Sequence, residues 1–140
     1  MKHEALTHTI IGCAMEVHKA LGNGFQEVVY QRALSIEMQM KGLDFEREKV
    51  MDIHYRGFEI GTRRVDFFVE GKIMVELKAV SNLEDVHLAQ AMNYLEAYDM
   101  AIGLLINFGA KSLQFKRLHN NKLTKSGNQV NQADHGSGVD

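Results

Sequence analysis

Two charged residues interrupt an apolar stretch of the sequence, residues 73–80 (IMVELKAV). Side chains alternate between the two faces of a β-strand, so Glu76 and Lys78 should share one face. Two charges in such a stretch are costly to bury without compensation. The pattern therefore indicates either an ion pair on a solvent-facing sheet or a functional site, and this stretch alone leaves both interpretations open.

A third charged residue, Asp66, lies in the preceding apolar stretch, residues 64–69, and Gly71 is midway between it and Glu76. A three-residue loop centred on Gly71 would place the two acids opposite each other on one face, whereas a two-residue loop would separate them. Adjacent carboxylates repel unless a cation lies between them, and Mg²⁺ binds one or two carboxylates together with several waters. We therefore predict a metal site at Asp66 and Glu76, with Lys78 beside it.

Two further polar residues lie on predicted helices. Glu27 belongs to the first helical turn after Gly24, a position where the helix dipole alone also favours an acid. Gln90 lies in the middle of a helix, where an amide is usually a polar flank. Neither residue indicates a site by itself.

The single cysteine, Cys13, lies on an apolar helix face and is expected in the core.

The elements that must position these residues are delimited by glycines, because the chain contains no proline. Helical periodicity predicts three helices, over residues 4–21, 25–41 and about 83–98. Ser81 and Asn82, followed by Glu84 and Asp85, are candidates for the cap of the third helix.

Strands are predicted from alternation, β-branched residues and turn glycines. They are a strand pair over 45–60, a hairpin of 64–69 with 73–80, and two strands at 102–108 and 113–118. The stretch 102–108 is almost entirely apolar, which predicts burial on both faces. This order of elements predicts a single-domain α/β fold around one mixed sheet.

The chain of 140 residues, 45% hydrophobic and 24% charged, is typical of one globular domain. No apolar run approaches ~18 residues, which argues against a membrane span. The first residues lack the apolar core of a signal peptide, and a single cysteine suits a reducing compartment. We expect a cytoplasmic protein that does not bind membranes.

The formal charge of −2 argues against a basic nucleic-acid coat. Residues 111–140 nevertheless hold five Lys or Arg against two acids, and all five lie within 111–125. This positive strip permits a nucleic-acid partner without requiring one. Beyond residue 120 the chain is rich in Asn, Gln, Gly, Ser and Lys. We therefore predict a domain over 1–120 and a flexible low-complexity tail over 121–140.

Residues 24–30 (GFQEVVY) match the motif G-x-x-E-x-x-Y. On this motif the chain resembles the GxxExxY protein family, part of the PD-(D/E)xK nuclease-like superfamily, over about residues 4–118. Other matching segments are residues 16–18, 21–22, 65–66, 75–80, 87, 90 and 104–109. Asn23 stands where many relatives have proline, a loop difference that should not affect the site.

The resemblance implies a restriction-endonuclease-like α/β core with helices flanking a central sheet. It implies Asp66, Glu76 and Leu77 as ligands of Mg²⁺ or Mn²⁺, and Lys78 as the catalytic lysine. It further implies Glu27 as a helix-borne acid and Gln90 as a supporting polar residue.

The function that this resemblance implies is metal-dependent hydrolysis of nucleic-acid phosphodiester bonds, with DNA expected rather than RNA. A non-catalytic nuclease-fold module that acts through a protein or nucleic-acid partner is the alternative, because a shared fold does not fix a substrate. A homodimer is one arrangement that would join two sites and two positive strips.

Overall fold

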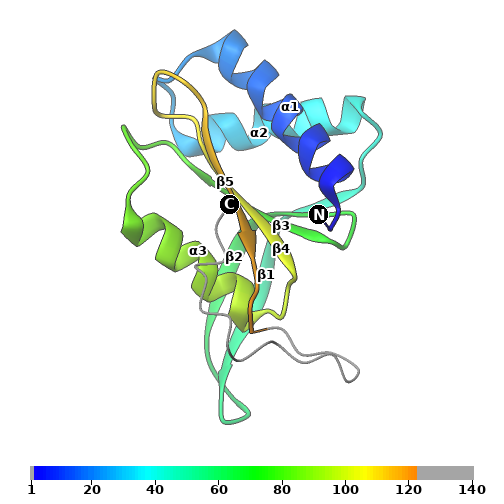
Figure 1. Ribbon diagram of the computed structural model, residues 1–140, viewed down its shortest axis with the longest axis vertical. Coiled ribbons are helices and arrows are strands. Elements are labelled where there is room, and N and C mark those ends of the chain that lie inside the picture. The colour runs from blue at the N-terminus through cyan, green and yellow to red at the C-terminus, as the bar shows by residue number, and fades with distance from the viewer. Residues whose placement is uncertain (1, 123–140) are drawn as a thin grey trace.

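The computed structural model describes residues 2–122, which form three helices and five strands (Figure 1). The elements, in chain order, are α1 (Glu4–Leu21), α2 (Glu27–Met40), β1 (Phe45–Tyr55), β2 (Phe58–Val69), β3 (Ile73–Lys78), α3 (Asp85–Ala97), β4 (Ile102–Asn107) and β5 (Gln114–His119). The tail predicted for 121–140 falls, from residue 123 onward, outside the described residues.

The five strands form one sheet in the order β1-β2-β3-β4-β5. β3 and β4 are parallel and are connected through α3, whereas all the other neighbouring pairs are antiparallel. The predicted α/β fold with a mixed sheet is therefore confirmed. No helix within residues 2–122 is long and apolar enough to cross a bilayer.

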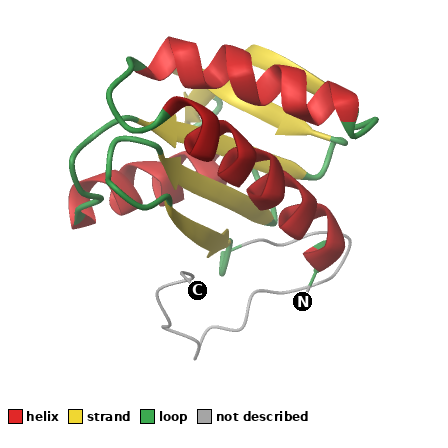
Figure 2. Ribbon diagram, turned by 90° about the horizontal axis from the view of Figure 1, so that it is seen from above, coloured by secondary structure: helices red, strands yellow, loops and turns green. Residues whose placement is uncertain are grey.

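Helices cover both faces of the sheet (Figure 2). On one face α1 and α2 pack against β3 and β4 through a buried cluster that includes Ile10, Leu34, Val75 and Leu104. On the other face α3 packs through a smaller cluster around Leu95 and the partner residues Val65, Met74, Leu105 and Leu118. β4 is buried along its whole length, as its apolar sequence predicts.

The prediction of a separate strand pair over 45–60 is wrong in one respect. β2 runs without interruption from Phe58 to Val69 and pairs with the whole of β1, so the two strands form one long hairpin that extends away from α1 and α2 (Figure 1). The register shifts beside Ile53 and His54, and the shift leaves Ile60 without a pairing partner. Ile60 is thus the extra residue of a β-bulge, and the two strands pair on both sides of it.

The turn between β2 and β3 has the predicted length. Val69 pairs with Ile73, which leaves a three-residue loop centred on Gly71, and the Lys72 N–H donates to the Val69 carbonyl at 2.9 Å. Gly71 has a φ of 65°, the left-handed conformation that glycine adopts without strain. The predicted register of the hairpin is therefore confirmed.

The cap of α3 differs from the prediction. Glu84, rather than Ser81 or Asn82, is the N-cap, and its backbone N–H donates to Nδ1 of His87 at 2.9 Å to close a capping box. Asn82 is engaged elsewhere, because its Oδ1 accepts a hydrogen bond from Gln114 of β5. The helix therefore begins where a side chain is free to cap it.

Candidate active site

The alternation of side chains along β2 is irregular at Asp66, and this irregularity positions the acid. Val65 and Phe67 are two residues apart and should share a face, yet they are buried in the clusters on opposite faces of the sheet. The facing residue on β1, Glu48, has a φ of 57°, in the left-handed region. The regular alternation is therefore interrupted between Val65 and Phe67, where Asp66 lies.

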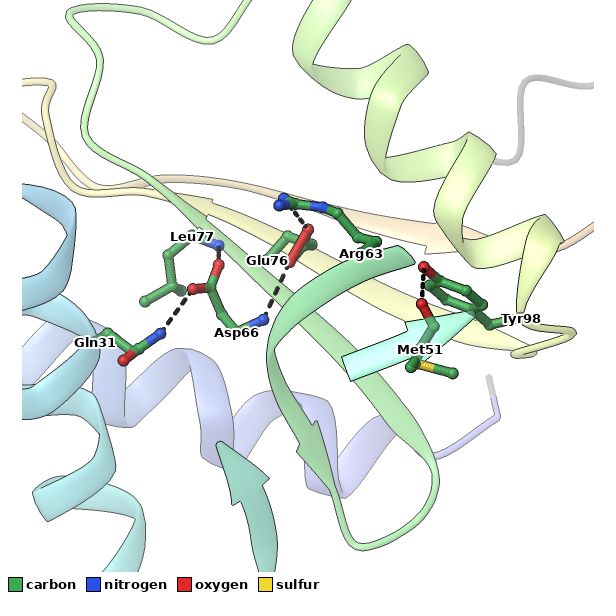
Figure 3. A network of polar contacts seen from close by, with 7 residues as sticks. All are labelled: Gln31, Met51, Arg63, Asp66, Glu76, Leu77 and Tyr98. Carbon is green, nitrogen blue, oxygen red and sulfur yellow. Dashed lines mark hydrogen bonds and ion pairs between the residues drawn. The ribbon is translucent and has the colours of Figure 1, made fainter. Parts of the chain in front are cut away.

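The backbone ladder between β2 and β3 ends beside the two acids, and their carboxylates replace it (Figure 3). The Leu77 N–H donates to Asp66 Oδ2 at 2.9 Å, and the Asp66 N–H donates to Glu76 Oε2 at 3.2 Å. Strand amides point along the plane of the sheet, so both carboxylates lie in the gap between the two strands. The carboxylate of Asp66 on β2 thus accepts a backbone N–H of β3, and the carboxylate of Glu76 on β3 accepts one of β2.

This arrangement differs from the expected pair of side chains on one face. The outer oxygen of Asp66, Oδ1, accepts a hydrogen bond from Gln31 Nε2 of α2 at 2.8 Å. The outer oxygen of Glu76, Oε1, accepts one from Arg63, which lies on the α3 side. Both carboxylates lie in the gap between the strands. The outer oxygen of Asp66 points toward α2, and the outer oxygen of Glu76 points toward the α3 side of the sheet.

Glu76 is the most deeply buried acid of the described chain, with 3% of its side chain exposed. Arg63 Nη2 lies 2.7 Å from its Oε1. Burial, and then the neighbouring charge of Asp66, raise the pKa of Glu76 to about 7, although Arg63 and the Asp66 N–H act in the opposite direction. The two neighbouring carboxylates therefore repel each other when both are ionised, as the spacing in the sequence predicts.

Glu27 begins α2 and lies near this pair. Although its side chain is exposed, the protein desolvates the carboxyl group on one side and raises its pKa, and Asp66 raises it further. Lys78 and Arg63 lower it. The structure therefore brings Glu27 and half-buried Lys78 into the electrostatic neighbourhood of Asp66.

The loop before α2 is fixed by Tyr30, the last residue of the G-x-x-E-x-x-Y motif. Its fully buried hydroxyl donates to the Gly22 carbonyl at 2.5 Å and accepts from the Phe25 N–H at 3.1 Å. The ring stacks on Phe108, with 4.6 Å between centroids. Because Phe25 is held in this way, α2 begins at Glu27 rather than at the predicted residue 25.

A second polar cluster fixes the chain directly after Lys78. Asn107, fully buried at the end of β4, accepts from the N–H groups of Val80 and Gly109 and donates to the Val80 carbonyl. A Cβ atom at Gly109 would collide with the backbone of Val80, so only glycine fits there. The end of β3, and with it Lys78, is held from the neighbouring strand.

Gln90 is not joined to the acids. It is exposed on α3, and no hydrogen bond links it to the described residues around Asp66. Its spacing places it one turn before Tyr94, on the side of the helix that faces Arg63. Leu77 buries its side chain in the core, so only its backbone carbonyl is available as a ligand.

Two residues of this site, Gln31 and Arg63, are not among those predicted from the sequence. Gln31 follows Glu27 by four positions on α2, and this spacing places both on one helical face, a signal that would have identified it. Arg63 gives no such signal, because it lies between the predicted strands 45–60 and 64–69, next to the exposed Arg64. Two surface hollows, one beside Asp44 and one between α1 and α2, lie away from these residues.

The donor set fits a divalent cation that keeps part of its water. Within residues 2–122, no three His, Cys, Asp or Glu side chains gather closely enough to hold a metal ion by themselves. Asp66 and Glu76 nevertheless offer two carboxylates side by side, and their oxygens retain free lone pairs. Mg²⁺ is commonly held by one or two carboxylates and several waters, so the pair is sufficient for it.

Comparison with known proteins gives one match. A family model described as the PD-(D/E)XK nuclease superfamily matches residues 4–118. These residues include both acids, Lys78 and all eight elements of the fold except the end of β5. No curated protein and no solved structure matches the chain significantly.

Proposed function

The chain belongs to the PD-(D/E)XK nuclease superfamily, and on this premise we propose that it hydrolyses phosphodiester bonds of nucleic acids with Mg²⁺ or Mn²⁺. The observation that carries the proposal is the interlocked pair of Asp66 and Glu76, followed by Lys78 two residues later on β3. The finer assignment to the GxxExxY family stays a prediction.

Asp66 and Glu76 would hold the metal ion, with the Leu77 carbonyl as a further oxygen donor. When bound, such an ion polarises a phosphate oxygen and lowers the pKa of a coordinated water. Gln31 holds the Asp66 carboxylate in one orientation, and Arg63 offsets the charge of Glu76. These two partners keep both acids in place before any substrate binds.

Lys78 has the role of a cation beside the reacting phosphate. Its ammonium group would orient the attacking water or stabilise the negative charge that develops on phosphorus. Glu27 lies close enough for electrostatic interaction with Lys78, and would hold that ammonium group against the site. Gln90, exposed on the helix that borders Arg63, would be a supporting polar residue of the site.

The proposal is tested by incubating the purified full chain with plasmid DNA, single-stranded DNA and RNA, with Mn²⁺ or with EDTA. We expect cleavage that needs the metal, is abolished in Lys78→Ala and Asp66→Asn, and is unchanged in Lys72→Ala, an exposed lysine of the β2–β3 turn. DNA is the expected substrate. Equal cleavage by the wild type and Lys78→Ala would contradict the proposal.

The alternative function, a nuclease-fold module that binds a partner without cleaving, is favoured by one property. The net charge of −2 is unusual for a protein that must bind nucleic acid without help. Metal-dependent binding of DNA or RNA without cleavage, under conditions where Lys78→Ala binds equally well, would support this alternative.

A further inference from the structure

Arg63 forms the closest ion pair in the described part of the chain, and it does so at a proposed metal ligand. Its Nη2 lies 2.7 Å from Glu76 Oε1, with 33% of the arginine side chain and 3% of the glutamate side chain exposed. The next residue, Arg64, pairs with Glu48 at a longer nitrogen–oxygen distance of 3.6 Å, and both of these side chains are far more exposed. Arg63 is therefore the specific counter-charge of Glu76.

Two contacts hold the guanidinium group of Arg63 in place. It donates to a nearly buried carboxylate, which is strongly destabilised if it loses its partner. Its central carbon lies 4.7 Å from the centre of the Tyr94 ring, a cation–π contact with α3. Its buried Nε has no hydrogen-bond partner within residues 2–122, so it adds no third anchor there.

The charges around the site indicate how much further positive charge it can accept. At pH 8.5, where all three acids are ionised, Glu27, Asp66 and Glu76 contribute three negative charges, and Arg63 and Lys78 contribute two positive ones, which leaves −1. One divalent ion brings the site to +1, which balances the single negative charge of a phosphodiester. A second divalent ion would bring it to +3, which a phosphodiester does not balance.

We propose that Arg63 takes the place of a second metal ion, so that the site holds one divalent cation. Arg63 places a positive charge at Glu76 Oε1. Glu76 Oε2 and the two Asp66 oxygens each accept one hydrogen bond from an uncharged donor, so they keep both a lone pair and uncompensated charge for that cation. Arg63 is then a positioning residue, since it acts through Glu76. This inference rests on the proposed function and specifies the metal content of the same site.

The number of bound ions tests this proposal without any measurement of activity. The full chain is titrated with Mn²⁺ at pH 8.5, and the free ion is followed by its electron paramagnetic resonance signal. Weak surface binding is subtracted with the Asp66→Asn protein. We expect one site-bound Mn²⁺ per chain in the wild type and in Arg64→Met. We expect two in Arg63→Met, because Glu76 Oε1 has then lost its counter-charge.

Two ions in the wild type would overturn the role of Arg63 while leaving the proposed metal site intact. A count and affinity in Arg63→Met equal to those in Arg64→Met would overturn it as well. No site-bound Mn²⁺ in the wild type would overturn both this inference and the proposed function. The wild-type count decides even if Arg63→Met does not fold, which circular dichroism would show.

Discussion

The backbone N–H of Asp66 donates a hydrogen bond to Glu76 Oε2 at 3.2 Å, which joins two acids that would otherwise repel. Asp66 Oδ2 in turn accepts the N–H of Leu77, the residue after Glu76. The charge of each carboxylate is therefore held close to the other by the backbone itself. This geometry makes the metal-free site sensitive to pH, to metal and to the residues around it.

The raised pKa of Glu76 predicts that the metal-free protein loses stability as the pH rises. Between about pH 4.5 and 7 the folded chain holds a proton that the unfolded chain has released, so the slope of stability against pH is negative. The loss is about 3 kcal/mol, complete above pH 7. Urea unfolding in EDTA from pH 5 to 8.5 measures it. Glu76→Gln should flatten the curve, and an equally steep curve in that variant would assign the slope to another group.

Gln31→Met should weaken Mn²⁺ binding about 10-fold, because Asp66 loses the donor that orients it and partners of this kind contribute 10–100-fold to metal affinity. Gln39→Met is the matched control, an exposed glutamine on the same helix. Calorimetric titration measures both. Equal affinities in the two variants would show that Asp66 needs no help from α2.

Tyr30→Phe removes a buried hydroxyl that bridges the Gly22 carbonyl and the Phe25 N–H. We expect a loss of about 1–3 kcal/mol in the free energy of unfolding, because both backbone groups lose a partner. Tyr55→Phe, on an exposed tyrosine of β1, should change it by less than about 0.5 kcal/mol. Urea unfolding of the two variants makes the comparison, and similar values would contradict this role of Tyr30.

Asn107→Ala should cost about 2–4 kcal/mol, because it leaves both backbone polar groups of Val80 and the Gly109 N–H without a side-chain partner. Asn93→Ala, at an exposed position of α3, is the control. Thermal unfolding with EDTA compares them. If Asn107→Ala and Asn93→Ala have the same melting temperature, the end of β3 is held by other contacts.

Much of the fold could be predicted from the sequence, because it depends on local patterns. The spacing of apolar residues predicts α1 at its observed bounds, and the position of Gly71 predicts the register that brings Asp66 opposite Glu76. These features need only helical periodicity and a turn glycine.

The fine geometry of the site could not be predicted in the same way. A strand pattern assumes uniform alternation, so it does not show that β2 turns over at Asp66 or that the carboxylates enter the gap between strands. The ion pair of Arg63 depends on how the bulged hairpin packs beneath Tyr94 of α3. Both features arise from contacts between distant segments.

The central claim is that Asp66 and Glu76 form a metal site rather than a structural cluster of charges. The most direct measurement is the thermal melting of the wild type, Asp66→Asn and Lys78→Ala, each with EDTA and with Mg²⁺ or Mn²⁺. An ion at about 100 times its Kd stabilises the folded state by about 2.7 kcal/mol. We expect that gain in the wild type and in Lys78→Ala, and its loss in Asp66→Asn. An identical response of the wild type and Asp66→Asn to the metal would contradict the metal site and the nuclease mechanism built on it.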